Sequence, residues 1–269
     1  MTAYNAERYI RHSLESVLIQ SDQDFECIVV DDGSTDETIK TARDIGDSRV
    51  RIIEAGRIGR GGALNLGVRE SRGTYIAIQD ADDLSHPHRL KIERRALDNS
   101  TKFAAVGSDH ILFDGSDYKW EEAHEAEERF SLTDVSSSLL MRSPISHTSL
   151  MVRRETLEKV GSYNETRSDL FDWDLYIRLA KTGFRIGKFL FPLAAHRVHE
   201  MQFFEHMERH AYVRHCYILQ REARKLLGRG VVHEAVFLLL YAYRLLPPIV
   251  RLGWRTDSRP ESVSPDRNF

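Results

Sequence analysis

The segment YIAIQDADD, residues 75–83, is a short strand-forming run that ends in three carboxylates, Asp80, Asp82 and Asp83. Like charges this close together repel one another and resist burial, so they persist where solvent, a cation or a helix N-terminus compensates them. Carboxylates that follow a strand suit Mg²⁺ or Mn²⁺, hard ions that also coordinate phosphates. The same pattern fits a solvated turn in which Asp82 or Asp83 caps the next helix. On its own the segment leaves both interpretations open.

Strand-like and helix-like stretches alternate on both sides of this segment. This pattern predicts an α/β domain over residues 1–200, with a mostly parallel sheet and helices on both faces. Asn5 is expected to cap the first helix, and Ser34 with Glu37 resembles a capping box for the second. The expected strands cover residues 25–30, 50–54, 75–79, 104–113, 146–152 and 184–191, and the expected helices cover residues 6–20, 35–45, 63–71, 87–98 and 173–181.

Residues 201–254 are predicted to form a helical extension whose second helix, 231–246, is strongly apolar. The longest uncharged run of that helix, Ala235 to Tyr243, is far shorter than the roughly 20 residues that cross a bilayer. The helix is therefore expected to pack on the domain or on a second subunit, or to lie in the membrane interface. Residues 120–129 are highly charged and are expected to be exposed over the site, and residues 255–269 have the composition of a disordered tail.

Composition narrows the class of protein. The 269-residue chain has a formal net charge of −3, whereas nucleic-acid binding usually needs a basic patch, so we expect no nucleic-acid partner. The two cysteines, Cys27 and Cys216, do not suggest a disulfide framework and fit a reducing compartment. The sequence opens on an expected amphipathic helix and not on a signal-peptide pattern. We therefore expect a cytoplasmic protein, with peripheral contact at the inner face of the cell membrane, or dimerisation through the C-terminal helices, as further options.

A second acidic pair, Asp31 and Asp32, follows the expected strand 25–30. In an open α/β sheet, ligands bind outside the carboxyl ends of the strands, so this pair and Asp80 to Asp83 should face one crevice. A nucleotide fits both clusters. Asp31 or Asp32 would accept hydrogen bonds from the nucleoside, and Asp80 and Asp82 would hold a cation for the phosphates.

Four motifs in this order resemble those of family 2 glycosyltransferases: TAYNAE at 2–7, VVDDGSTD at 29–36, GGALNLG at 61–67 and DADD at 80–83. The resemblance extends over about residues 2–200. It implies the GT-A fold and an inverting transfer from a nucleotide diphosphate sugar, for which we expect a UDP-sugar. The implied acceptor is a hydroxyl of a glycan or lipid-linked glycan, as in polysaccharide biosynthesis, and the implied cofactor is Mn²⁺ or Mg²⁺.

The segment DWDLYIRL, residues 172–179, resembles the acceptor-side motif of this family, in which the first aspartate is the catalytic base. The implied base is Asp172. An inverting transfer needs one carboxylate that takes the proton from the attacking hydroxyl. Asp172 and Asp174 could instead be structural carboxylates stabilised at a helix start. Phe171 stands where the family usually has a glutamate, which leaves the geometry around the base open.

The segment HRVHE, residues 196–200, resembles a further family element that approaches the diphosphate or the metal. Arg197 would offset phosphate charge and His199 would contact the ion. The resemblance implies nucleotide contacts by Tyr4, Asn5, Asp31, Asp32, Arg60, Asn65, Asp80, Ala81 and Arg197, metal contacts by Asp80, Asp82 and His199, and acceptor contacts by His147, Trp173 and Asp174.

The chain departs from the family pattern at its start, because only Met1 precedes the TAYN turn where relatives have a full apolar strand. We expect a truncated first strand, and greater stability for a longer product with a Val/Ile-rich strand upstream, since an absent inner strand leaves backbone groups unpaired. Two other functions stay open. One is a catalytically silent sugar-nucleotide-binding partner protein. The other is a sugar nucleotidyltransferase, although the sequence lacks a glycine- and lysine-rich triphosphate loop near its start.

Overall fold

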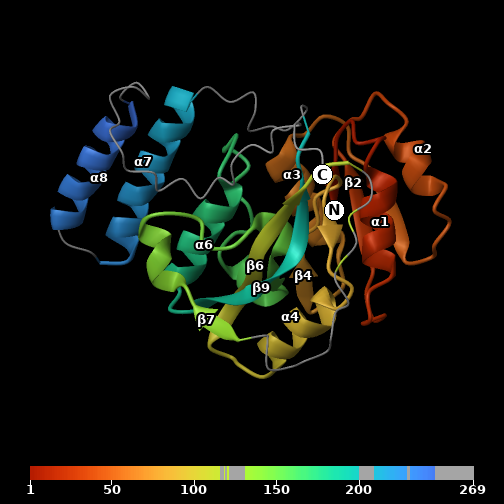
Figure 1. The fold of residues 1–269 in the computed structure, drawn as a ribbon, viewed down its shortest axis with the longest axis horizontal. Coiled ribbons are helices and arrows are strands. Elements are labelled where there is room, and N and C mark those ends of the chain that lie inside the picture. Colours follow the sequence, from red (N-terminus) through yellow and green to blue (C-terminus); the bar gives the residue numbers. More distant parts are fainter. Residues whose placement is uncertain (116–117, 119, 121–130, 200–208, 229–230, 246–269) are drawn as a thin grey trace, which may run out of the picture.

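The computed structural model describes residues 1–115, 118, 120, 131–199, 209–228 and 231–245, which form a mixed α/β fold (Figure 1). The first sheet is entirely parallel, in the order β1-β2-β3. All five residues of β2 are buried, and the first four, Cys27 to Val30, form a continuous apolar run and not an alternating one. The sheet contains β1 (Thr2–Ala3), β2 (Cys27–Asp31) and β3 (Val50–Glu54), and its connections carry α1 (Ile10–Leu18) and α2 (Thr38–Arg43).

The second sheet has the order β4-β8-β6-β9-β5, with β7 beside β9. Its longest pair, β6 and β9, is parallel, and the other pairs are antiparallel. A parallel bridge between Thr2 and Asp80 connects the two sheets, so β1 lies next to the acidic segment. The strands are β4 (Tyr75–Ala77), β5 (Leu84–Ser85), β6 (Phe103–Phe113), β7 (Leu132–Asp134), β8 (Met151–Arg153) and β9 (Arg185–Arg197).

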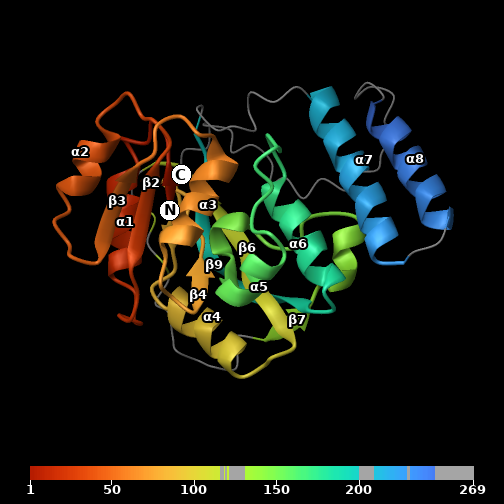
Figure 2. The same ribbon diagram turned by 180° about the vertical axis from the view of Figure 1, so that it is seen from behind.

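Helices cover both faces of these sheets (Figures 1 and 2). The expected strand at 146–152 is instead a 3₁₀ turn, η3 (His147–Ser149), followed by β8. The remaining helical elements are α3 (Arg60–Glu70), α4 (Arg89–Asp98), η2 (Ser136–Leu140), α5 (Arg154–Lys159), α6 (Phe171–Lys181), α7 (Arg209–Leu226) and α8 (Val231–Leu245).

Neither of the two expected helix caps forms. Helix α1 begins at Ile10 and α2 at Thr38, each later than predicted. Asn5 and Ser34 bind each other's loops instead: the Asn5 N–H donates to Ser34 Oγ at 2.9 Å, and Asn5 Oδ1 accepts the Thr35 N–H at 2.9 Å. The caps were predicted from local spacing, but the two loops lie side by side and offer better partners. The loops after β1 and β2 are thereby joined at the carboxyl ends of these strands.

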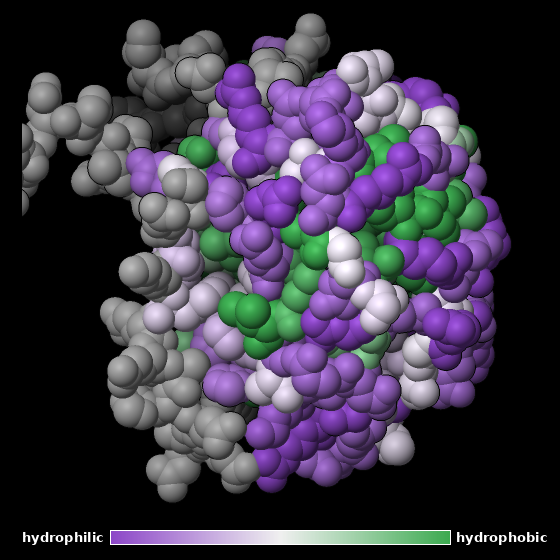
Figure 3. Space-filling view, turned by 90° about the vertical axis from the view of Figure 1, so that its right-hand side faces the viewer, coloured by the Kyte–Doolittle hydropathy of each residue, from purple (hydrophilic) through white to green (hydrophobic). Residues whose placement is uncertain are grey.

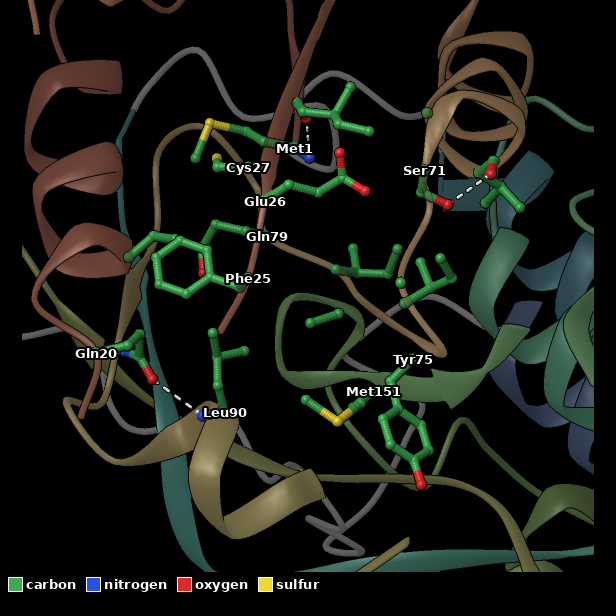
Figure 4. Close-up of a pocket in the computed structure, with 18 of the residues that line it drawn as sticks. Met1, Gln20, Phe25, Glu26, Cys27, Ser71, Tyr75, Gln79, Leu90 and Met151 are labelled. Atoms are coloured by element: carbon green, nitrogen blue, oxygen red, sulfur yellow. Dashed lines mark hydrogen bonds between the residues drawn. The ribbon is translucent and has the colours of Figure 1, made fainter. Parts of the chain in front are cut away.

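A cavity of about 540 Å³ lies between β2 of the first sheet and β4 of the second, and we call it the cavity behind β1. Its lining includes Cys27 of β2, Gln79 after β4, Leu90 of α4 and Met151 of β8 (Figure 4). The backbone nitrogen of Met1 donates to the Ile28 carbonyl at 2.8 Å, and its burial lowers the pKa of this amino group. On the α1 and α2 side of the molecule, a band of hydrophobic residues lies between hydrophilic ones (Figure 3).

Helices α7 and α8 pack against each other beside α6, with the rings of Tyr217 and Tyr241 4.8 Å apart. Leu219 and Ala223 of α7 are fully buried, whereas Leu239 of α8 is 71% exposed. Among the described residues, no helix has both the length and the apolar composition needed to cross a membrane. The expected exposed segment 120–129, apart from Trp120, and the tail 255–269 lie outside the described residues, as do residues 200–208 and 246–254 of the expected helical extension.

Candidate active site

The aspartates that follow β4 point to different partners. Asp83 is fully buried, where its Oδ1 accepts the Arg197 N–H at 3.0 Å and its Oδ2 lies 3.1 Å from His196 Nδ1. Burial raises the pKa of Asp83 to about 6. Asp82 is more open, and its Oδ2 lies 3.0 Å from His199 Nε2. Asp83 therefore anchors the end of β9, which brings His199 to Asp82.

Asp80 forms an ion pair with Arg60, the first residue of α3, with Arg60 Nη2 2.7 Å from Asp80 Oδ1. Burial opposes ionisation of Asp80, but the combined effect of Arg60, His147 and His196 outweighs burial and lowers the pKa of this carboxyl. The backbone of Asp80 is held as well, since its carbonyl accepts from Ser13 Oγ at 2.9 Å. Ala81, between Asp80 and Asp82, is buried.

The two aspartates at the end of β2 have different hydrogen-bond partners. Asp32 accepts from the backbone N–H groups of Ile58 and Gly59, each at 2.8 Å, and from Arg57 Nη1 at 2.6 Å. Asp31 accepts from the N–H groups of Gly33 and Ser34 through Oδ2, whereas its buried Oδ1 has no hydrogen-bond partner among the described residues. An unsatisfied buried oxygen is costly unless a ligand or water completes it. Asp31 is thus the better candidate for a nucleoside contact.

The end of β9 carries Arg197 and His199. Arg197 Nε donates to the Asp82 carbonyl at 2.9 Å, and its guanidinium lies over the rings of Tyr9 and Phe113. Burial lowers the pKa of Arg197. A cavity of about 220 Å³ opens beside His199, lined by Arg8, Tyr9, His12, Gly115, Arg197, Val198 and His199.

The donor atoms near Asp82 fit an ion that is also held by phosphates. Within the described ranges, no group of three or more candidate ligands gathers in one place. Asp82 and His199 nevertheless present one oxygen and one nitrogen within 3.0 Å of each other. Mg²⁺ and Mn²⁺ sites that serve phosphate chemistry commonly use one or two protein carboxylates and take the other ligands from phosphates and water. The residues present fit such a shared site.

Asp172 lies in the first turn of α6, where the helix dipole favours a carboxylate. Ser143 Oγ donates to Asp172 Oδ2 at 2.6 Å, and the aspartate remains partly exposed. Helix α6 is preceded by Leu170 in the left-handed conformation, with a φ of 51°. Phe171 is buried against Gly61, where an added Cβ would come within 3.3 Å of its ring. Phe171, which stands in place of the family's glutamate, is thus a packing residue, and Gly61 of α3 allows its ring to approach closely.

His147 lies between Arg60 of α3 and Tyr163. Its Nε2 lies 3.0 Å from the Tyr163 hydroxyl, and its Nδ1 lies 3.5 Å from Arg60 Nη2. Burial lowers the pKa of His147. The negative charges of Asp80 and Asp172 both help to raise the pKa of Arg60, so these two carboxylates act on the same guanidinium. The acidic segment and the start of α6 therefore both lie near Arg60.

Several residues predicted from the sequence have their side chains engaged elsewhere. The Asn65 amide binds both backbone groups of Tyr163 and the Glu165 carboxylate. Trp173 is buried and donates from Nε1 to the Leu139 carbonyl at 2.8 Å. Asp174 pairs with Arg167 and Arg178. Tyr4 stays exposed, and its ring lies 3.7 Å from the guanidinium carbon of Arg57.

Sequence reasoning missed Ser143, Tyr163 and the pairing of His196 with Asp83. Ser143 and Tyr163 belong to none of the motifs, and although His196 and Asp83 each belong to one, no fixed spacing relates those two motifs. Ser143 is 29 positions from Asp172, and His196 is 113 positions from Asp83, so only the tertiary fold brings each pair together.

A family model described as glycosyl transferase family 2 matches residues 1–161. The chain belongs to the family 2 glycosyltransferases. It is 31% identical over 193 residues to the putative glycosyltransferase EpsE of Bacillus subtilis, covering 69% of this chain and 66% of that protein. It is 30% identical over 183 residues to the chondroitin synthase of Escherichia coli, covering 67% and 26% respectively. The chain therefore spans at most about two thirds of the length of these relatives.

Solved structures share the fold at low sequence identity. Residues 1–349 of TarS from S. aureus, in complex with UDP-GlcNAc, give a TM-score of 0.65 at 18% identity, covering 90% of this chain and 70% of that one. The mannosyltransferase PcManGT from Pyrobaculum calidifontis, in complex with GDP-Man and Mn²⁺, gives 0.63 at 20% identity, covering 91% and 70%. The expected GT-A type α/β fold is thereby confirmed.

Proposed function

We propose that this protein is an inverting glycosyltransferase that moves a sugar from a UDP-sugar to a hydroxyl of a glycan or lipid-linked glycan. The observation that carries the proposal is that carboxylates of two segments, Asp80 with Asp82 and Asp172, lie close enough to act on the same Arg60 guanidinium. Asp80 and Asp82 follow β4, where Asp80 pairs with the Arg60 guanidinium and Asp82 with the His199 imidazole, and Asp172 lies in α6 with a hydroxyl on its Oδ2. The first segment suits the donor diphosphate, and the second suits the acceptor.

The donor nucleoside would lie over the ends of β1 and β2. Asp31 Oδ1 is a buried acceptor without a partner in the described part of the chain, which suits a base N–H or a ribose hydroxyl. Tyr4 and Arg57 form an exposed stack beside it that can extend over the nucleotide base. Asp32 would act indirectly by holding the loop that contains Arg57. The preference for UDP is supported by TarS, which was solved with UDP-GlcNAc.

Asp82 and His199 would hold the divalent ion, Mn²⁺ or Mg²⁺, with Asp80 able to join them. Bound there, the ion would offset the charge that develops on the departing diphosphate. Mn²⁺ was present in the PcManGT complex, which supports this choice. Arg60 neutralises Asp80 in the structure, and its guanidinium is close enough to turn toward an incoming phosphate.

Asp172 would take the proton from the acceptor hydroxyl as that oxygen attacks the anomeric carbon from the side opposite the diphosphate. The carbon–oxygen bond to the acceptor forms as the bond to the diphosphate breaks, which inverts the anomeric configuration. Ser143 fixes one carboxylate oxygen by donating to Asp172 Oδ2. The other oxygen can then face the acceptor.

A panel of UDP-sugars and GDP-sugars, each with and without Mn²⁺, tests the proposal through the melting temperature and the release of nucleoside diphosphate. We expect a UDP-sugar with Mn²⁺ to give the largest rise in melting temperature, together with slow release of UDP. A GDP-sugar that stabilises more would overturn the choice of UDP. Donor binding without any turnover, even with a range of glycan acceptors, would favour a catalytically silent partner protein.

A further inference from the structure

Helix α7 is attached to the chain segment that leads into α6. His215 Nδ1 lies 2.6 Å from Asp169 Oδ2, and Asp169 is only 3% exposed. Seven positions later on α7, the Glu222 carboxylate accepts from Arg167 Nη2 at 3.1 Å. Both contacts reach the loop within five residues of Asp172. The loop therefore enters α6 in a conformation that α7 helps to fix.

The same helix is attached to the segment that carries Ser143. Gln220, 1% exposed, donates from Nε2 to the Met141 carbonyl at 3.1 Å. Met141 ends the η2 turn and lies two residues before Ser143, the hydroxyl that donates to Asp172. Cys216, Leu219 and Ala223 are buried between these polar contacts, and both ribbon views show α7 alongside α6 (Figures 1 and 2).

We propose that α7 positions the Asp172 carboxylate, and that His215 and Gln220 are its positioning residues. This inference rests on the proposed function, in which Asp172 is the base. Two segments distant in sequence meet at Asp172, and α7 holds each of them a few residues from the meeting point. A carboxylate that shifts by about 1 Å loses in-line reach to the acceptor hydroxyl, at a cost of about 100-fold in rate. The proposed donor contacts lie outside α7, on β1, β2, the β4–β5 turn, the start of α3 and the segment that follows β9.

His215→Ala tests the first attachment, and His215→Asn keeps a side-chain N–H at the place of Nδ1. His210→Ala is the matched control, because His210 is exposed on the same helix. We expect His215→Ala to lower kcat for sugar transfer about 10- to 100-fold with UDP affinity within about twofold of the unaltered protein. His215→Asn should restore most of the rate, and His210→Ala should leave it unchanged. Gln220→Ala tests the second attachment in the same assays.

Amide hydrogen exchange on the same proteins gives a readout that does not depend on turnover. We expect faster exchange at residues 139–145 and 169–174 in His215→Ala, with no change in β2 and β3. An unchanged kcat, unchanged exchange in these two segments, or an equal loss of UDP affinity and kcat would overturn the positioning role. A protein that transfers no sugar from any donor would refute the proposed function, while the exchange data would still decide whether α7 holds the two segments.

Discussion

His199 Nε2 lies 3.0 Å from Asp82 Oδ2, although 117 positions separate the two residues in sequence. The contact depends on the end of β9, where Arg197 binds the backbone carbonyl of Asp82 and its own N–H binds Asp83. The end of β9 thus holds the acidic turn through two residues and brings an imidazole nitrogen next to it. We expect Asp82 and His199 to bind the divalent ion.

Replacing Asp82 should weaken metal binding without disrupting the fold. We expect Asp82→Asn to weaken Mn²⁺-dependent binding of UDP at least about tenfold, because the amide oxygen is a poorer ligand than a carboxylate. Isothermal titration with and without Mn²⁺ measures the effect. Asp44→Asn, at an exposed aspartate directly after α2, is the control and should bind as before. Mn²⁺ dependence that survives in Asp82→Asn would place the ion elsewhere.

Replacing Asp172 should affect chemistry and not donor binding. We expect Asp172→Asn to lower kcat for transfer by about 10²- to 10⁴-fold, because the amide cannot accept the proton, while UDP binds with unchanged affinity. Asp174→Asn makes a useful contrast, because that carboxylate pairs with Arg167 and Arg178 and its loss should lower the melting temperature. Normal turnover by Asp172→Asn would remove this residue as the base.

His86 should make the protein less stable in mild acid. Burial lowers the pKa of His86 from its usual 6.5 to about 4. Between these values the unfolded chain binds a proton that the folded chain does not, so the free energy of unfolding falls as pH decreases, by about 3 kcal/mol at most. Above pH 6.5 the group has no effect.

Urea unfolding of His86→Asn between pH 4 and 7 checks this prediction. The asparagine side chain in this variant can keep the hydrogen bond that His86 Nδ1 accepts from the His88 N–H. The variant should therefore show a flatter dependence of stability on pH, whereas His210→Ala should follow the unaltered protein. Identical slopes in all three proteins would mean that His86 is not neutral in the folded state.

The cavity behind β1 should accept an added strand. Residues of β2 and β4 line a cavity of about 540 Å³, and Met1, whose buried amino group donates to the Ile28 carbonyl, lines it as well. Fusing five Val/Ile-rich residues ahead of Met1 would turn the amine into an amide and fill the cavity with apolar side chains. We expect the melting temperature to rise by at least about 5 °C relative to a Gly/Ser extension of equal length. Equal melting temperatures would contradict the prediction.

Local patterns predicted what depends on neighbouring residues. The apolar run that forms β2, the helix around Asp172 and the acidic turn after β4 each follow from a few consecutive residues, and the family and its α/β fold are confirmed. The caps at Asn5 and Ser34 were wrong, because each side chain finds a partner in the other loop. The local motif around Trp173 likewise does not show that this side chain packs into the core, because that packing depends on the tertiary fold.

The anomeric configuration of the sugar when it is first released from an α-linked UDP-sugar shows whether the enzyme inverts or retains. Slow donor hydrolysis can be followed by proton NMR before the free sugar mutarotates, and it needs no knowledge of the acceptor. An inverting enzyme with Asp172 as base predicts that the β-anomer appears first, and that Asp172→Asn releases it far more slowly. If the α-anomer appears first, or if no UDP-sugar that binds is hydrolysed, the protein is not an inverting glycosyltransferase with Asp172 as its base.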